Sequence, residues 1–143
     1  MEASKTLTPV TIETTVNATP EKAWKIWNTP EDITQWCSAD LATWHTPWAQ
    51  NDLRKGGIYK CRMEARDGSA GFVIESVYDE VVPHKHIQYT MSDGRKVVVD
   101  FIPEGNNTKI VQRFDPENEN PVEFQRAGWQ AILDNYKKYV ESK

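Results

Sequence analysis

Residues 19–36 read TPEKAWKIWNTPEDITQW, and this stretch contains the tripeptide Thr-Pro-Glu twice, ten residues apart. In each copy the threonine can cap a helix, and the proline takes the first helical position, where its missing N–H costs nothing. The first helix is expected to span residues 20–28, because Thr29 precedes a proline and resists helical geometry. Thr29 then caps a second helix, with Asp32 three residues later in a position like that of a capping box. Helices of two or three turns are not stable alone, so the sequence predicts a broad surface beneath both.

The predicted surface is a β-sheet, because apolar and polar residues alternate with period two along much of the chain. A first strand is expected at residues 7–17. Three turn signals, DGS at 67–69, SDG at 92–94 and EGNN at 104–107, separate later runs of this kind. Polar residues alternate with the apolar ones, which is typical of an antiparallel meander with one solvent-exposed face. The strand at 71–82 is apolar on both faces, so its orientation stays open. The six later strands are expected at residues 43–51, 57–66, 71–82, 85–92, 95–103 and 108–115.

The stretch NPVEFQRAGWQAILDNYKKYVESK, residues 120–143, predicts a long helix of about 20 residues. Asn120 is expected to cap this helix, with Pro121 at its first position and Glu123 completing a capping box. Gly128 costs roughly 1 kcal/mol relative to alanine inside a helix, so it is either tolerated or required because a neighbouring group packs close to it. The apolar face is expected to comprise Val122, Phe124, Trp129, Ile132, Leu133, Tyr136 and Val140.

The length of 143 residues is typical of one domain, which we expect to span residues 1–143. The net charge of −4 and the lack of a Lys/Arg cluster argue against a nucleic-acid partner, since phosphate binding needs concentrated positive charge. No apolar run approaches the ~20 residues of a membrane span, so membrane insertion is not expected. The N-terminal residues lack the apolar core of a secretory signal, which favours a cytoplasmic protein. Two cysteines are too few for a disulfide framework.

The order of one strand, two short helices, six strands and one long helix predicts an α+β helix-grip fold. In this fold a curved seven-stranded antiparallel sheet wraps a long C-terminal helix. The sequence also resembles the domain shared with activators of the heat-shock protein 90 ATPase, a family of the START-like (SRPBCC, birch-pollen-allergen-like) superfamily. The resemblance rests on residues 19–36, NDLRKGGIY at 51–59, SDGRKVVVDF at 92–101 and EFQRAGWQAILDNYKKYVE at 123–141. It implies that the two short helices form a V that closes one end of the concave side.

The resemblance also implies a function. Members of the superfamily commonly hold a sterol, lipid, polyketide or flavonoid-like molecule between sheet and helix, so binding of a small hydrophobic molecule without a cofactor is the first expectation. A co-chaperone-type interaction with a chaperone or another protein partner is the second. A cofactor-free cyclase or dehydratase-like enzyme is the third, and no residue is assigned a catalytic role.

The inward-facing positions of the strands and the long helix supply the residues expected to line such a cavity. In the alternative hypothesis, the same side chains meet and fill the interior. Gln112 distinguishes the cavity hypothesis from the filled-interior hypothesis. A buried amide without a hydrogen-bond partner costs roughly 1–3 kcal/mol of stability, so its partner is informative. Gln112 either orients a carbonyl or hydroxyl of a ligand, or bonds to a tyrosine hydroxyl or the backbone. The expected cavity residues are Tyr59, Cys61, Met63, Tyr89, Met91, Gln112, Phe114, Trp129, Leu133 and Tyr136.

The remaining chemically active side chains give weaker signals. The His-x-His pair at 84–86 has no evident third ligand, so no metal site is expected. Cys61 is the one thiol predicted to face inward, and nothing near it in the sequence lowers its pKa. Glu75 either faces solvent or, if inward, has its pKa raised by burial and becomes a general-acid candidate. Trp44 and Trp48 either pack against the second short helix or form an exposed protein-binding patch or the cavity mouth.

Overall fold

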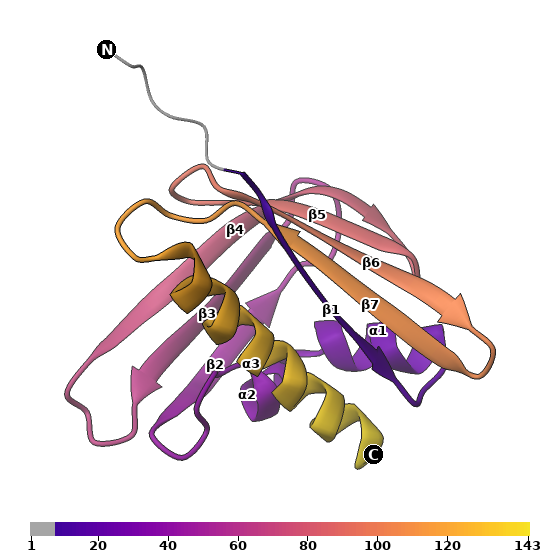
Figure 1. Cartoon of the computed structure of the whole chain (residues 1–143), viewed down its shortest axis with the longest axis horizontal. Helices are drawn as coiled ribbons and strands as arrows, with labels where there is room; N and C mark the ends of the chain where they lie inside the picture. Colours follow the sequence, from indigo (N-terminus) through magenta and orange to yellow (C-terminus); the bar gives the residue numbers. More distant parts are fainter. Residues whose placement is uncertain (1–7) are drawn as a thin grey trace.

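The computed structural model describes residues 8–143, which form one seven-stranded antiparallel sheet and three helices (Figure 1). The helix-grip fold predicted from the sequence is confirmed, although residue 7, where the first strand was expected to begin, lies outside the described residues. The order across the sheet is β1-β7-β6-β5-β4-β3-β2, so β1 and β2 form its two edges. The helices are α1 (Pro20–Asn28), α2 (Pro30–Trp36) and α3 (Val122–Glu141). The strands are β1 (Val10–Val16), β2 (Trp44–Asn51), β3 (Ile58–Ala65), β4 (Gly71–Val82), β5 (His86–Met91), β6 (Lys96–Glu104) and β7 (Asn107–Phe114).

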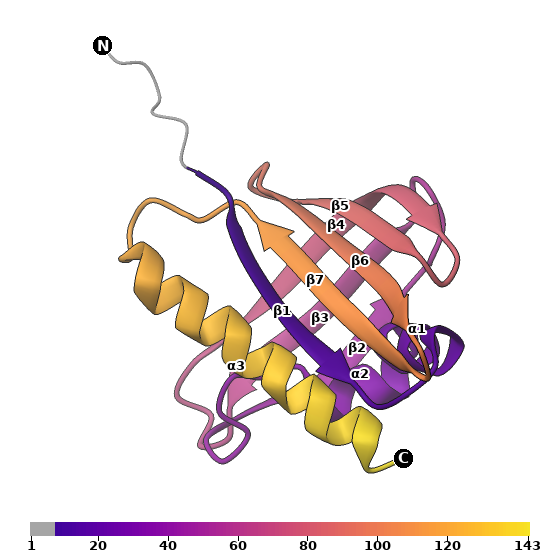
Figure 2. The same ribbon diagram turned by 45° about the vertical axis from the view of Figure 1, so that its right-hand side comes forward.

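The sheet is strongly curved, and α3 runs along β1 on its concave side (Figure 2). The two short helices lie at one end of the concave side, where α1 contacts β6 and β7 and α2 contacts β2. Both short helices also contact α3. The doubled Thr-Pro-Glu sequence therefore builds the closed end of the fold. No helix within the described residues is both long and apolar enough to cross a bilayer.

Aromatic side chains fill this closed end. The ring of Trp27 lies 5.1 Å from that of Trp36, 5.8 Å from that of Phe101 and 4.8 Å from that of Tyr136, measured between centroids. The buried hydroxyl of Tyr136 donates a hydrogen bond to the carbonyl oxygen of Ala23 at 2.6 Å. Such aromatic pairs add to the free energy gained by burial. The short helices are therefore stabilised by packing rather than by their own helix propensity.

The last helix is fixed to the free edge of β1 by hydrogen bonds from its polar side chains. An edge strand carries backbone groups that no neighbouring strand pairs, and α3 satisfies three of them. The acceptors are the carbonyl oxygens of alternate residues: Thr11, Glu13 and Thr15. Their respective donors are Arg126 at 3.0 Å, Gln130 at 3.3 Å and Lys137 at 2.6 Å. These bonds cover the edge and set the position of α3 beside β1.

The sequence DLRKGG folds into the compact loop between β2 and β3. Gly56 has a φ of 81°, in the left-handed region that glycine adopts without strain. Its N–H donates to the carbonyl of Tyr78 at 2.9 Å, and the N–H of Tyr78 donates to the carbonyl of Gly57 at 3.0 Å. A Cβ atom at Gly57 would collide with the carbonyl oxygen of Asp52. The two glycines therefore let this loop close against β4.

The predicted start of the long helix is wrong by one residue. The helix begins at Val122, its N-cap is Pro121, and no side chain caps it. Asn120 lies one residue before the N-cap and makes no capping bond, while its side-chain amide donates to the carboxylate of Glu117 at 2.7 Å. The side chain of Gln125 holds this loop instead, accepting from the N–H of Glu117 at 2.8 Å and donating to its carbonyl at 3.0 Å.

The two threonines of the doubled motif behave differently. Thr19 caps α1 as predicted, since its side chain accepts a hydrogen bond from the backbone N–H three residues later at 3.3 Å. Thr29 lies at the N-cap of α2, but its hydroxyl donates to the carbonyl of Lys25 at 2.6 Å and makes no capping bond. Asp32 accepts from the hydroxyl of Tyr139 at 2.6 Å, so it ties α2 to α3. The predicted capping box at α2 is therefore not formed.

Gly128 provides a test of the fold. A Cβ atom there would meet no atom within 4 Å, so close packing is not the reason for this glycine. We expect Gly128→Ala to raise the free energy of unfolding by about 0.5–1 kcal/mol, because alanine is the better helix former. Urea denaturation measures the change.

Gly57→Ala is the matched control, since it places the same methyl group against the backbone of Asp52. We expect it to destabilise the fold by about 1–3 kcal/mol. If Gly128→Ala instead lowered the denaturation midpoint, the open space beside Gly128 would be contradicted.

Candidate functional site

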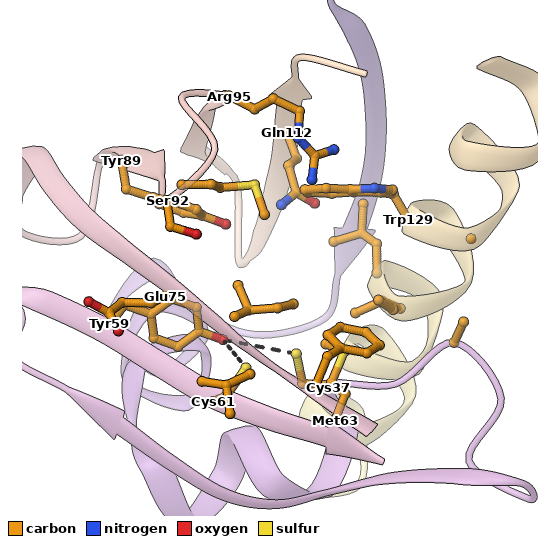
Figure 3. Close-up of a pocket in the computed structure, with 18 of the residues that line it drawn as sticks. Cys37, Tyr59, Cys61, Met63, Glu75, Tyr89, Ser92, Arg95, Gln112 and Trp129 are labelled. Atoms are coloured by element: carbon orange, nitrogen blue, oxygen red, sulfur yellow. Dashed lines mark hydrogen bonds between the residues drawn. The ribbon is translucent and has the colours of Figure 1, made fainter. Parts of the chain in front are cut away.

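A cavity of about 800 Å³ lies between the concave face of the sheet and the N-terminal half of α3 (Figure 3). The sheet side is formed mainly by residues of β3, β4, β5 and β7, and the helix side by α3. Phe72 and Phe124 belong to the lining but are 49% and 69% exposed, so they stand at a mouth open to solvent. The side chains that form the wall are Tyr59, Cys61, Met63, Ile74, Tyr78, Tyr89, Met91, Gln112, Trp129, Ile132 and Leu133.

The structure brings most of the residues predicted to line a cavity into this wall. Two of them lie behind it. Phe114 is 1% exposed and stacks on Trp129, with ring centroids 4.0 Å apart and an angle of 6° between the planes. Tyr136 belongs to the aromatic cluster at the closed end. Whether the wall residues bind a ligand stays a prediction. Those in the wall are Tyr59, Cys61, Met63, Tyr89, Met91, Gln112, Trp129 and Leu133.

Two hydrophobic residues expected on the buried face of the long helix are exposed. Val122 is 39% and Phe124 is 69% exposed. They lie in the first turn of α3, where the helix passes beside the mouth of the cavity and no strand covers it. The predicted apolar face is therefore correct only from the second turn onward.

The strand that the sequence could not orient contributes directly to the wall. Ile74 lies opposite Cys61 in β3, and Tyr78 lies opposite Tyr89 in β5, so both face the cavity with their partners. The alternate residues Val73 and Val77 face outward, where they are 45% and 42% exposed. Because β4 carries apolar residues on both faces, the alternation of residues in the sequence could not predict this orientation.

Glu75 and His86 are held by neighbouring polar side chains. Glu75 is among the residues that line the cavity (Figure 3), but its side chain is exposed and its carboxylate lies 3.5 Å from the ammonium group of Lys60, so the hypothesis of a buried general acid is wrong. His86 contacts Asp100 at 2.7 Å and Glu80 at 3.1 Å through its two ring nitrogens. Within residues 8–143 no three His, Cys, Asp or Glu side chains are arranged to hold a metal ion.

A second thiol, which the sequence did not single out, joins Cys61 beside the cavity. Figure 3 shows the hydroxyl of Tyr59 between the two sulfur atoms, 3.6 Å from that of Cys61 and 4.0 Å from that of Cys37. Burial raises the pKa of Tyr59, and the neighbouring Cys61 thiol together with burial raises the pKa of Cys37. Cys37 and Tyr59 are therefore neutral near pH 7, and a neutral buried thiol is inert as a nucleophile. Hydrogen bonding from Cys37 and Tyr59 instead lowers the pKa of Cys61, an effect that its neighbours in the sequence did not indicate. Cys37 follows the end of α2, where no periodicity indicates its direction.

Gln112 does not form the hydrogen bonds that would make it a purely structural residue. Its side chain is 6% exposed and lies in the cavity wall, yet its amide bonds to no other described residue. Figure 3 shows the amide directed into the cavity beside Trp129. The expected alternative of a bond to a tyrosine hydroxyl or to the backbone is therefore wrong.

The sequence profile described as "Activator of Hsp90 ATPase homolog 1-like protein" matches residues 17–141. The chain belongs to this family. No functionally curated protein matches the chain. The same fold is found in solved structures of bacterial proteins.

An AHSA1-like protein from Aeromonas hydrophila is 38% identical, with 94% of this chain and 93% of that chain covered and a TM-score of 0.88. A protein from Cytophaga hutchinsonii is 50% identical, with 92% and 91% covered and a TM-score of 0.81. A protein from Chromobacterium violaceum shares the fold at 20% identity, with 94% and 98% covered and a TM-score of 0.84.

Two tyrosines of this chain allow the polar wall to be tested. Tyr136→Phe removes the buried hydrogen bond to Ala23 and is expected to lower the free energy of unfolding by about 1–2 kcal/mol. Tyr89→Phe removes a hydroxyl that has no partner among the described residues, so its cost is expected to be below about 0.5 kcal/mol. Chemical denaturation of both variants measures the difference. Equal destabilisation would show that the Tyr89 hydroxyl is bonded within the protein.

Proposed function

We propose that the chain binds a small hydrophobic molecule, of a lipid, sterol, polyketide or flavonoid-like kind, in the cavity between the sheet and α3, without a cofactor. The cavity itself is the observation that carries this proposal. Its volume of about 800 Å³ is within the range of roughly 300–1,000 Å³ that is typical of small-molecule sites. Such sites combine an apolar wall with a few polar groups, as the cavity here does.

Packing energetics support the same conclusion. Protein interiors are normally close-packed, and each unfilled volume forgoes contacts that would stabilise the fold. Here the chain leaves part of the volume beside α3 unfilled. Gly128 has space for a side chain but carries none, and the Trp129 ring lies flat on Phe114. A hollow kept in this way is better explained by a ligand than by the needs of folding.

We also propose a cytoplasmic location. The supporting observation is that Cys37 and Cys61 are both buried and free although their sulfur atoms contact the same hydroxyl, that of Tyr59. Thiols close to each other persist in a reducing compartment.

A co-chaperone-type interaction is the second candidate function. It is favoured by the family and by apolar side chains on the outer face of β2, β3 and β4. The exposed residues are Trp48, Ile58, Val73 and Val77. Stimulation of a heat-shock protein 90 ATPase by the wild-type protein, lost in Val73→Asp, would establish this function. A cofactor-free enzyme is the third candidate. The raised pKa values of Tyr59 and Cys37 keep both groups protonated, whereas the lowered pKa of Cys61 makes that thiol the nucleophile candidate of the cluster.

Filling the cavity tests the binding proposal. N-phenyl-1-naphthylamine, an uncharged dye that fluoresces in apolar sites, is expected to bind the wild-type protein saturably. Gly128→Leu places a larger side chain in the open space of the wall and is expected to weaken this binding about tenfold. A fluorescence titration measures the dissociation constant.

Gly128→Ala is the control, because it makes the same change of helix propensity while filling little of the cavity. Denaturation curves verify that both variants are folded. If Gly128→Leu bound the dye as tightly as the wild-type protein, the dye site would lie outside the cavity and the proposal would fail.

A further inference from the structure

The five tyrosines of the chain differ in how their hydroxyl groups are satisfied. Three of them donate to a protein oxygen at 2.5–2.6 Å: Tyr78, Tyr136 and Tyr139. The other two, Tyr59 and Tyr89, line the cavity, with ring centroids 6.1 Å apart. Among the described residues, Tyr59 contacts only the two thiols, which are weak acceptors, and Tyr89 has no partner. Tyr89 is therefore the tyrosine whose hydroxyl has no partner among the described residues, while Tyr59 donates only to sulfur.

Gln112 adds a second unpaired polar group to the same wall. It lies in β7 opposite Val99 of β6 and Ile12 of β1, so its neighbours in the sheet are apolar. An amide that is 6% exposed and unpaired costs roughly 1–3 kcal/mol unless water or a ligand bonds to it. Figure 3 shows Gln112 and Tyr89 on the same side of the cavity, with Tyr59 on the other. A molecule in the cavity thus meets two unused hydrogen-bonding groups on one side, and a hydroxyl that donates only to sulfur on the other.

The charged residues that line the cavity are engaged by neighbouring groups. Figure 3 shows the guanidinium of Arg95 directed toward Gln112 and Trp129, and it pairs with Asp93 at 2.8 Å in the turn between β5 and β6. Glu117 is held in the loop before α3 by Asn120, and Glu75 pairs with Lys60. A negative charge placed deep in the cavity would therefore lose its hydration, while Arg95, the cation that lines the cavity, already has a carboxylate partner.

The phenols of the wall are hydrogen-bond donors at neutral pH. Burial raises the pKa of Tyr89 and of Tyr59. Both keep their protons, and the amide nitrogen of Gln112 also donates. The interior therefore offers donors to an oxygen acceptor that carries no charge.

Resting on the proposed function, we infer that the ligand is an uncharged molecule with an apolar body and a carbonyl oxygen. The carbonyl oxygen accepts hydrogen bonds from the wall formed by Gln112 and Tyr89. The apolar body fills the space between Met63 and Leu133. A carboxylic acid of the same shape binds less well, because the cation that lines the cavity, Arg95, is already paired with Asp93.

Three probes with one diphenyl body separate these contributions: benzophenone, its alkene isostere 1,1-diphenylethylene, and diphenylacetate. Titrations followed by NMR chemical shifts measure the three dissociation constants. We expect benzophenone to bind about three- to tenfold more tightly than 1,1-diphenylethylene, the effect of one or two hydrogen bonds, and diphenylacetate to bind most weakly. In Gln112→Met/Tyr89→Phe, benzophenone and 1,1-diphenylethylene should bind equally, at the affinity that the wild-type protein has for the alkene.

Gln88→Met is the matched control, because Gln88 lies in the same sheet but alternates with Ile87 and Tyr89 and faces outward. It should keep the wild-type preference. Equal binding of ketone and alkene by the wild-type protein, or tighter binding of diphenylacetate, would overturn the inference and leave the cavity proposal standing. Failure of all three probes to bind would overturn both.

Discussion

The position of α3 along the free edge of β1 is the constraint on which the rest of the structure depends. Side chains of α3 donate to three alternate carbonyl oxygens of β1 at 2.6–3.3 Å, and Glu141 accepts from the N–H of Asn17 at 2.9 Å. A helix held at one edge of a curved sheet cannot settle onto the middle strands. The two short helices prevent it from moving toward the closed end. Space therefore remains between α3 and strands β3 to β5, and that space is the cavity.

The C-terminal half of α3 packs into a filled core, whereas its N-terminal half lines the cavity. Tyr136 and Val140, in its C-terminal half, are fully buried against the closed end. In the N-terminal half, Gly128 carries no side chain and Trp129 stacks flat on Phe114, so the helix reaches less far toward the sheet. The hollow is thus a consequence of residue size along one helix face.

The sequence predicts the strands and the starts of the two short helices well. Period-two alternation and the Thr-Pro pairs that mark those starts are local signals. It fails where a tertiary contact competes with a local one. Asn120 is engaged by Glu117 rather than by the helix, and Thr29 bonds backward to Lys25. Cys37 could not be recognised as a cavity residue from the sequence. It follows the end of a helix, where no periodicity predicts the direction of a side chain. Strand alternation could identify the residues of the cavity wall. Whether side chains of the sheet and of α3 meet and fill the interior depends on the distance between α3 and the sheet, which alternation does not predict.

Polar groups are treated differently in the two halves of the interior. At the closed end, the hydroxyl of Tyr136 and the indole N–H of Trp36 reach backbone carbonyls at 2.6 and 3.4 Å. In the cavity wall, Gln112 and Tyr89 have no such partners. Groups of this kind must be paired by water or by a ligand, since leaving them dry is costly. If the cavity binds a hydrophobic molecule, as we propose, a molecule that expels this water without replacing its hydrogen bonds loses affinity.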